Sequence, residues 1–281
     1  MSGIVDRRDL LRAGMAAAIG GWRLPFARRA RLARIGLELY SVRDAMRADP
    51  GGTLAKVRAI GYSDVELLWS FDNFGQTVAQ VGAELRRLGL RAPSAHIAPE
   101  TLLGDWRRSL HDANQLGHQY LIVPSLPDET RSSLDAWRRW ADRFNEAGRT
   151  ARRAGIWLAF HNEPEHQHPI GGTVPYDVFI TATDPSLVRL QLDVGNMVMG
   201  GGDPFAYLAA HRDRYWSFHL KDVTVDRGGD TELGRGTFDF GRFLRAVPRL
   251  DEKPCYVEQE HPADALASAG IDYRFLRDLR F

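Results

Sequence analysis

The 281-residue sequence lacks features that would assign it to several common classes of protein. A single cysteine, Cys255, excludes an internal disulfide and a cysteine-rich zinc site. No stretch approaches the roughly 20 consecutive apolar residues that a membrane-spanning helix needs. The formal net charge is only +1, so the composition gives no electrostatic reason to expect a nucleic-acid partner. No G-x-G-x-x-G motif follows the first predicted strand, which argues against a dinucleotide-binding fold.

Short apolar stretches recur along the chain, and segments with helical periodicity separate them. Eight stretches have the length and the bounding turn residues of strands, and they begin at Ile35, Asp64, Ala92, Tyr120, Ile156, Val188, Trp216 and Pro254. Glycines that fit helix ends precede several of the strands: Gly61, Gly89, Gly117 and Gly155. This alternation predicts an α/β fold, a (β/α)8 TIM barrel that residues 34–281 form as a single domain. The alternative is an open, doubly wound parallel sheet.

Residues 1–33 have a different character from the rest of the chain. Arg7 and Arg8 precede Leu10, Leu11 and a short, weakly apolar segment, a pattern typical of a twin-arginine export signal. This leader predicts a periplasmic or otherwise exported protein. If the segment is instead a basic amphipathic or disordered tail, we expect the protein in the cytoplasm. Beyond the leader we expect no integral membrane segment.

Side chains alternate across a strand, and the later strands divide into an apolar and a polar set. The stretch WSFHLKDV places Trp216, Phe218 and Leu220 on one face, and Ser217, His219 and Lys221 on the other. In a barrel, the apolar face packs on the helices and the polar face points at the axis. The same division predicts further inward-facing residues: Glu38, Glu66, His96, His161, Glu163, Arg189, Gln191, Asp193, Tyr256, Glu258 and Glu260. Those at the carboxyl ends of strands should meet at the mouth where barrel enzymes have their active sites.

Four of these residues lie at or near the ends of the last four strands and are candidate metal ligands: Glu163, Asp193, His219 and Glu258. Such oxygen and nitrogen donors suit one divalent ion, Mn²⁺, Mg²⁺, Co²⁺ or Zn²⁺. Without a cation, three carboxylates at one mouth would repel one another, and at least one would bind a proton. A structural ion-pair network that includes Lys221 and Arg189 is the alternative interpretation.

Seven motifs follow one another in register from about residue 35 to the end: GLELYSVRD, SAHI, LAFHNE, LQLDVGNMVMGGGDP, HLKD, ELGRGTFDF and YVEQE. With them the sequence resembles the sugar phosphate isomerase/epimerase superfamily of xylose isomerase-like barrels, which includes inosose dehydratases, ketose 3-epimerases and enzymes acting on 3-keto-sugars. The resemblance implies that Glu163, Asp193, His219 and Glu258 hold one divalent metal. One motif departs from the family, because many members read YHNHxxEF where this chain reads FHNEPEHQ. Glu165 is therefore an alternative to Glu163.

The resemblance and the residues together predict a metal-dependent sugar isomerase or epimerase. A carboxylate would remove the proton between a hydroxyl and a carbonyl group of a free or glycosidic keto-sugar, giving an enediolate, and a second group would return it. The catalytic candidates are Glu163, Glu258 and Lys221. The candidate substrate-binding residues are His96, His161, Glu38, Tyr40 and Trp69, and Phe71 is a candidate for lid packing.

Other functions share part of this pattern. A lyase or dehydratase acting on a 3-keto-glycoside would begin with the same proton abstraction. In an aldolase, Lys221 would form a Schiff base with the substrate. A DNA-repair endonuclease shares the barrel, but it would need a basic groove that the charge balance does not support. A non-catalytic carbohydrate-binding barrel is the alternative of another class, and a homo-oligomer is compatible with each of these functions.

Overall fold

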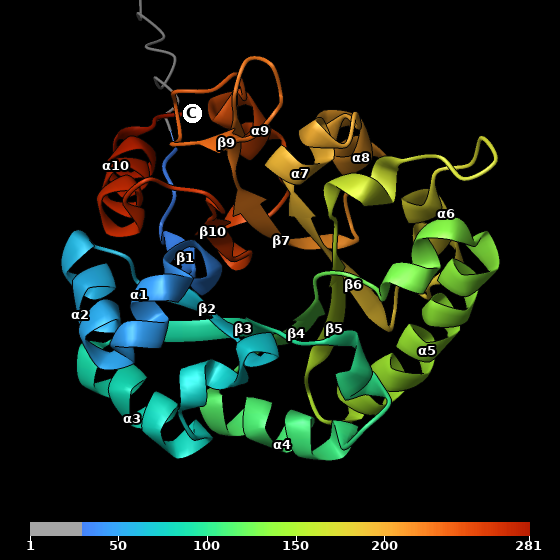
Figure 1. The fold of residues 1–281 in the computed structure, drawn as a ribbon, viewed down its shortest axis with the longest axis horizontal. Helices are drawn as coiled ribbons and strands as arrows, with labels where there is room; N and C mark the ends of the chain where they lie inside the picture. The colour runs from blue at the N-terminus through green and yellow to red at the C-terminus, as the bar shows by residue number, and fades with distance from the viewer. Residues whose placement is uncertain (1–29) are drawn as a thin grey trace, which may run out of the picture. The chain divides into compact units, whose positions relative to one another are not determined.

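Eight parallel strands close into a barrel, as the sequence predicts (Figure 1). The computed structural model describes residues 30–281, and the predicted export signal around Arg7 and Arg8 lies outside the described residues. The strands follow the order β1-β10-β7-β6-β5-β4-β3-β2 around the barrel, and β1 pairs with both β2 and β10. Their bounds are β1 (Gly36–Glu38), β2 (Asp64–Leu68), β3 (Arg91–His96), β4 (Tyr120–Val123), β5 (Trp157–His161), β6 (Val188–Asp193), β7 (Tyr215–Leu220) and β10 (Cys255–Val257).

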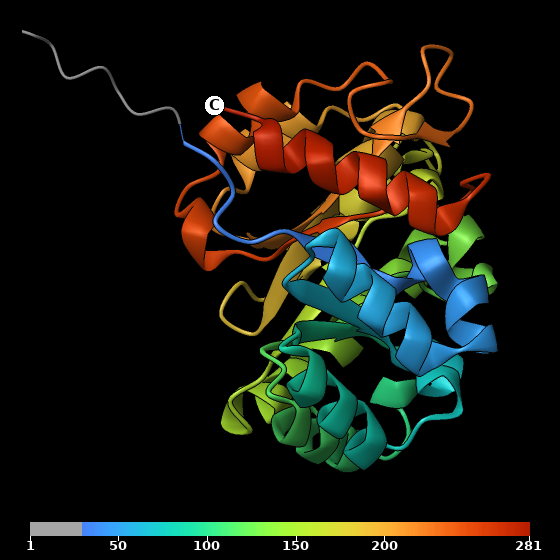
Figure 2. The same ribbon diagram turned by 90° about the vertical axis from the view of Figure 1, so that its left-hand side faces the viewer.

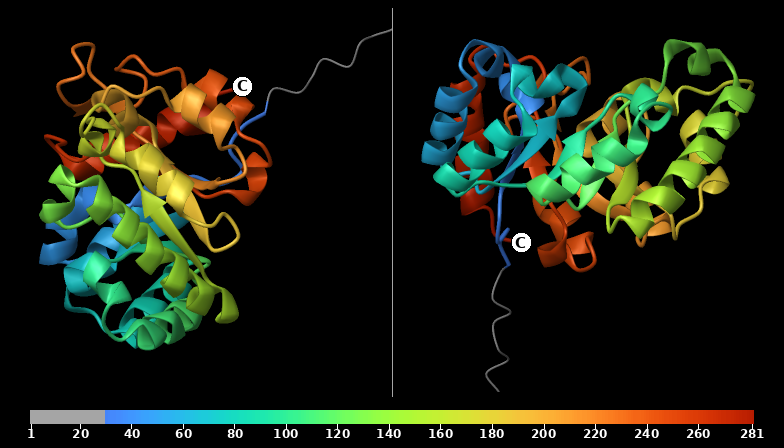
Figure 3. Two further views of the ribbon diagram at one scale, coloured as in Figure 1. Left: turned by 90° about the vertical axis from the view of Figure 1, so that its right-hand side faces the viewer. Right: turned by 90° about the horizontal axis from the view of Figure 1, so that it is seen from below.

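The helices form an outer layer around these strands (Figures 1 and 3). They are α1 (Arg43–Ala48), α2 (Pro50–Ile60), α3 (Val78–Leu88), α4 (Trp106–Leu116), α5 (Leu134–Arg153), α6 (Pro175–Ala182), α7 (Val194–Met199), α8 (Pro204–Ala210), α9 (Phe240–Ala246) and α10 (Ala265–Asp278). The last helix, α10, packs beside α2, so the two ends of the outer layer meet (Figure 2). A small antiparallel pair, β8 (Asp222–Val223) and β9 (Asp230–Thr231), follows β7. Within residues 30–281, no helix has both the length and the apolar character needed to cross a membrane.

Local sequence accounts for where several helices begin and end. Thr77 caps α3 by accepting a hydrogen bond from the backbone N–H of Gln80, whose side chain bonds back to the Thr77 backbone. Gly89 and Gly117 follow α3 and α4 with φ of 65° and 74°, the left-handed conformation that glycine adopts without strain. The predicted helix ends are confirmed at both positions, and each is followed directly by the turn into the next strand.

The outward-facing residues of the strands form the main core beneath the helices. Phe218 is completely buried, and its ring lies 5.5 Å from that of Phe243 in α9. Phe160 of β5 packs in the same way against Phe144 of α5 and Phe179 of α6. Burial of such rings supplies most of the attraction between the two layers. The inward-facing residues are consequently free to be polar.

Trp216 occupies a different place from the one predicted. The pairing of β6 with β7 shifts register between Leu190 and Gln191, which leaves Trp216 in a bulge between two paired residues. The guanidinium carbon of Arg189 lies 3.8 Å from the centre of the Trp216 ring and 3.6 Å from the centre of the Trp157 ring. The prediction that Trp216 shares the helix-facing side with Phe218 is therefore wrong, because the bulge interrupts the alternation. Arg189 belongs to this aromatic stack within the barrel rather than to an ion-pair network with Lys221.

Candidate active site

Histidine and carboxylate side chains converge at the carboxyl ends of the strands. One group holds His161, Asp193, His219 and Glu258, with one donor atom from each within 4.8 Å of all the others. His161 and Asp193 are the last residues of β5 and β6, His219 lies one residue before the end of β7, and Glu258 directly follows β10. The barrel thus brings together residues almost 100 positions apart in the sequence. We call these four residues the upper group.

His219 lies at the centre of the charged residues. Its Nδ1 is 2.6 Å from Glu258 Oε2, and its Nε2 is 2.5 Å from Oε2 of Glu66 in β2. Burial by itself lowers the pKa of an imidazole, but Glu258 and Glu66 outweigh this effect and raise the pKa of His219 to about 10. The same contacts hold the pKa of Glu258 well below its usual value, with Lys221 as the largest favourable charge opposing its burial.

Lys221 is fully buried and surrounded by acidic groups. Its Nζ lies 3.1 Å from Asp193 Oδ2, 3.3 Å from Glu258 Oε2 and 2.5 Å from Glu260 Oε1. Burial would lower the pKa of Lys221, but these carboxylates raise it well above its usual value. A lysine held as the ammonium ion is a poor nucleophile, so this geometry disfavours the aldolase alternative.

The LDVGN motif (residues 192–196) builds the part of the site around Asp193. Asp193 Oδ1 accepts a hydrogen bond from the backbone N–H of Asn196, which leaves Oδ2 directed at the upper group. Asn196 Oδ1 in turn accepts from Lys221, and its Nδ2 donates to Glu163. A Cβ atom on Gly195 would lie 2.8 Å from the Lys221 carbonyl oxygen and 2.6 Å from its Cγ. Because Gly195 has no Cβ atom, Lys221, which directly follows β7, can pack this closely against it.

The structure separates the two glutamates that the sequence left open after β5. Glu163 faces the site: its Oε2 accepts from Asn196, and its Oε1 lies 3.9 Å from His161 Nε2. Glu165 instead pairs with Arg131 at 3.1 Å. Burial raises the pKa of Glu163 well above its usual value, although Lys221 opposes the shift. Among the described residues, the donor atoms that converge in the upper group include His161 rather than Glu163, which lies beside it.

A second, overlapping group lies on the β1–β3 side of the barrel and consists of Glu38, Glu66, His96 and His219. We call it the lower group. Among the described residues, neither oxygen of the fully buried Glu38 has a hydrogen-bond partner, and burial together with the neighbouring Glu66 raises the pKa of Glu38 well above its usual value. Sequence reasoning found Glu66 and Gln191 as inward-facing residues but gave them no role, and it did not identify Asn196.

A cavity of about 320 Å³ opens above the upper group. Its lining includes His96, His161, Glu163, Glu258 and Glu260, with Tyr40 and Phe71 among the remaining residues. The Tyr40 and Phe71 rings contact each other edge to face at 5.8 Å. The Trp69 ring instead lies 5.3 Å from that of His118, and Trp69 is not among the residues that line this cavity.

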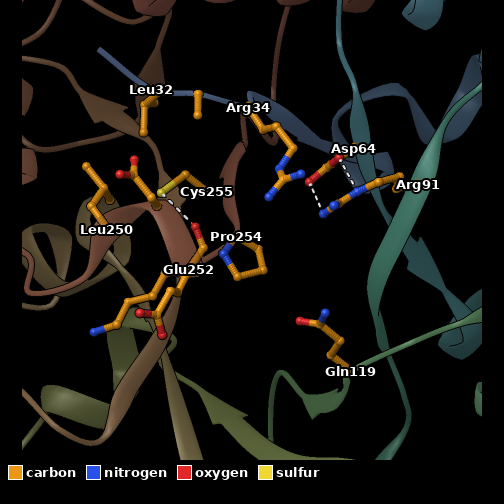
Figure 4. A pocket seen from close by; sticks show the side chains of 12 residues that line it. Leu32, Arg34, Asp64, Arg91, Gln119, Leu250, Glu252, Pro254 and Cys255 are labelled. Atoms are coloured by element: carbon orange, nitrogen blue, oxygen red, sulfur yellow. Dashed lines mark hydrogen bonds and ion pairs between the residues drawn. The ribbon is translucent and has the colours of Figure 1, made fainter. Parts of the chain in front are cut away.

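A smaller cavity of about 70 Å³ lies where several strands begin, at the other end of the barrel (Figure 4). Asp64 and Arg91, the first residues of β2 and β3, form two hydrogen bonds there at 3.1 and 3.0 Å. Lys253, which also lines this cavity, has its pKa lowered to about 8, chiefly by burial. Barrel enzymes have their active sites at the carboxyl ends of the strands, and this cavity lies at the other end, so we assign it no catalytic role.

The upper group fits a divalent cation by the chemistry of its donors. Two imidazoles and two carboxylates form a hard, mixed nitrogen and oxygen set, which suits Mn²⁺, Co²⁺ or Zn²⁺ and admits Mg²⁺. Within residues 30–281, Asp193 Oδ2 is buried, pairs with the Lys221 ammonium at 3.1 Å and accepts no hydrogen bond of good geometry, so it can serve as an acceptor for such an ion. Burial raises the pKa of Asp193 to about 7, against the opposing charge of Lys221, and this carboxylate would gain from a nearby positive charge.

Comparison with known proteins identifies the family of this barrel. The sequence profile described as "Xylose isomerase-like TIM barrel" matches residues 54–279. The chain belongs to this family. The resemblance drawn from the seven motifs is thereby confirmed, and so is the predicted fold.

Curated relatives include two inosose dehydratases. The one from Bacillus cereus strain AH820 is 25% identical over 193 residues, and the one from Lacticaseibacillus casei is 32% identical over 154 residues. The alignments cover 58% and 52% of this chain, and 63% and 47% of the two relatives. The chain therefore spans between about half and two thirds of the length of these relatives.

Solved structures share the fold over most of the chain. A sugar phosphate isomerase/epimerase from Parabacteroides distasonis superimposes with a TM-score of 0.74 and 23% identity, covering 88% of this chain and 94% of that one. The IolI protein with a bound zinc atom gives a TM-score of 0.68 and 14% identity, with coverage of 87% and 97%. At these identities the two likenesses show the architecture alone.

Proposed function

We propose that the protein is a divalent-metal-dependent sugar isomerase or epimerase that acts on a free or glycosidic keto-sugar. The observation that carries this proposal is the convergence of His161, Asp193, His219 and Glu258 beside a cavity, which His161 and Glu258 line together with two further glutamates. Sugar-modifying relatives of the same family support it.

The cation would be held by the upper group, in which His161 is the ligand from β5. Glu163, which the sequence predicts as that ligand, lies next to His161. When bound, the ion supplies a Lewis acid that polarises a substrate carbonyl group. The fully buried Lys221 holds Asp193 and Glu258 through ion pairs, and it donates hydrogen bonds to Asn196 and Glu260. It is not among the residues lining the cavity, so we assign it a positioning role.

Proton transfer is assigned to two glutamates that reach the cavity from different strands. Glu163 follows β5, whereas Glu258 follows β10, and β6 and β7 lie between these strands in the barrel. One carboxylate would remove the proton from the hydroxyl-bearing carbon next to the carbonyl group. Return of a proton to the opposite face of that carbon would give the epimer, and return to the former carbonyl carbon would give the isomer. His96 and His161 also line the cavity and would contact substrate hydroxyl groups.

The lining of the cavity favours an uncharged sugar. Three glutamates line it, and none of the arginines and lysines in the described part of the chain does. A phosphate group would meet negative charge without a matching cation, so a phosphorylated substrate is disfavoured. Tyr40 and Phe71 present aromatic surface on which a sugar ring can pack.

A lyase acting on a keto-sugar is the second candidate, and the inosose dehydratase relatives favour it. It would begin with the same proton abstraction and then expel a hydroxyl group from the neighbouring carbon. The products distinguish the two functions, since only the lyase releases water.

The experiment is a solvent-exchange assay in deuterated buffer. Protein freed of metal with a chelator is reloaded with Mn²⁺ and incubated with unphosphorylated ketoses and 3-keto-glycosides, and NMR detects deuterium next to the carbonyl. We expect exchange with at least one substrate, and a loss of about 100-fold or more in Glu163→Gln. The matched control is Glu165→Gln, because Glu165 pairs with Arg131 outside the site. Absence of exchange from every substrate would reject proton-transfer chemistry and favour the sugar-binding alternative.

A further inference from the structure

Gln191 lies in the middle of the histidines and links the upper and lower groups. Its side chain, completely buried in β6, takes part in hydrogen bonds with four other residues. These are His96 Nε2 at 2.9 Å, His161 Nδ1 at 3.0 Å, both Glu66 oxygens at 3.1 Å and Ser217 Oγ at 3.0 Å.

Glu66 determines which way the Gln191 amide points. The amide nitrogen donates to the two carboxylate oxygens of Glu66, which accept but cannot donate when ionised. Three other donors also surround the Glu66 carboxylate: His96 Nε2 at 3.1 Å, His219 Nε2 at 2.5 Å and the Ser94 hydroxyl, so its oxygens act as acceptors. The amide oxygen must therefore face the two histidines, and an oxygen acceptor requires an N–H from each ring.

This requirement sets the two rings in opposite tautomers. His161 donates from Nδ1, so the lone pair of the neutral ring is on Nε2, the nitrogen nearest Glu163 and Asn196 in the site. His96 presents Nε2 to Gln191 and to Glu66, at 2.9 and 3.1 Å, so its N–H belongs on Nε2, while Nδ1 is 3.8 Å from Glu38. The His161 lone pair thereby faces Asn196 and Glu163 on the side of the site that lines the cavity.

The hydrogen bonds of His219 also determine in which of the two groups it can bind a cation. A neutral imidazole has one lone pair, so His219 cannot be a ligand in both groups while it keeps a ring proton. Its Nε2 lies 2.5 Å from Glu66, and an N–H there makes a charge-assisted hydrogen bond. Only Nδ1, which faces Glu258 and Asp193, then remains for a cation.

We propose that Gln191, oriented by Glu66, is a positioning residue that fixes the ring tautomers of His161 and His96 and so directs cation binding to the upper group. The inference rests on the proposed cation site. In this account, the β2 and β3 residues of the lower group bind no cation and instead hold the metal-binding histidines in place, as hydrogen-bond partners of such histidines commonly do.

The first test uses the protein without metal or substrate. In a long-range ¹H–¹⁵N NMR spectrum of histidine-labelled protein, protonated and unprotonated ring nitrogens are well separated. We expect wild-type His161 as the Nδ1–H tautomer, which is the less common form in water, and His96 as the Nε2–H tautomer. The two rings are identified by loss of their signals in His161→Gln and His96→Gln. A wild-type spectrum with His161 in the Nε2–H form would overturn the proposal, whatever the catalytic activity.

The second test measures metal affinity in Gln191→Met, which keeps the side-chain length but removes the hydrogen bonds. We expect His161 to lose its single tautomer and Mn²⁺ to bind about 10- to 100-fold more weakly. The matched control is Ser217→Ala, which removes one bond to the Gln191 amide and leaves both Glu66 bonds intact. It should keep the wild-type tautomers and affinity. Unchanged Mn²⁺ affinity in folded Gln191→Met would contradict the proposal, whereas failure of the exchange assay alone would bear only on the proposed function.

Discussion

Replacement of Lys221 by methionine is predicted to destabilise the metal-free protein strongly. The change removes a buried ammonium group, which lies 3.1 Å from Asp193 and 3.3 Å from Glu258 in the wild type, and leaves His219 as the remaining cationic partner of Glu258. Breaking a buried ion pair from one side costs about 3–5 kcal/mol. The third partner, Glu260, is 27% exposed and adds little to this value because water screens it. For a barrel of this size, such a loss lowers the melting temperature by roughly 10 °C.

The stability that Lys221→Met loses is expected to increase with pH. Lys221 opposes the burial that raises the pKa of Asp193 to about 7, so its removal should raise that pKa further. A folded state that binds more protons than the unfolded chain loses stability as the pH rises, so the deficit should be larger near pH 8 than near pH 6.

The assay is thermal unfolding followed by circular dichroism, with and without added Mn²⁺. The matched control is Lys56→Met, the same substitution at an exposed position of α2. We expect Mn²⁺ to stabilise Lys221→Met more than the wild type, because the ion no longer shares its carboxylates with an ammonium group. If metal-free Lys221→Met melts no lower than Lys56→Met, the claim that Lys221 stabilises the folded protein through Asp193 and Glu258 is refuted.

Two further predictions concern stability and export. Burial lowers the pKa of His118 to about 4 from an ordinary value of 6.5, so the unfolded chain takes up a proton first as the pH falls. The wild type should therefore lose up to about 3 kcal/mol of unfolding free energy between about pH 6.5 and pH 4, and urea titrations of His118→Gln should show a smaller loss. If the leader is a twin-arginine signal, the double variant Arg7→Lys, Arg8→Lys should accumulate in the cytoplasm of a bacterial host, and unchanged fractionation would count against export.

The fold was predictable because it depends on features that repeat along the chain. Each strand is short, apolar on the side that faces the helices and followed by a helix with clear end signals such as Gly89 and Gly117. Repetition of this unit leaves few other architectures that bury all the apolar faces. The inward-facing positions followed from the same alternation, and three of the four candidate ligands, Asp193, His219 and Glu258, lie together in the upper group.

The parts that were not predictable depend on local departures from regular strands. β5 ends at His161 and Pro164 begins a helical turn, so alternation could not decide how Glu163 and Glu165 point. The bulge that turns Trp216 toward Arg189 has no marker in the sequence. The role of Gln191 depends on residues from four other strands, and no pattern within one strand can indicate which hydrogen bonds it forms.

The most direct measurement of the central claim is a crystal structure of the Mn²⁺-loaded protein with anomalous data collected at the manganese edge. The account predicts one strong peak bounded by His161, Asp193, His219 and Glu258, and its disappearance in Asp193→Asn. A peak placed instead among Glu38, Glu66 and His96, or no peak at saturating Mn²⁺, would contradict it.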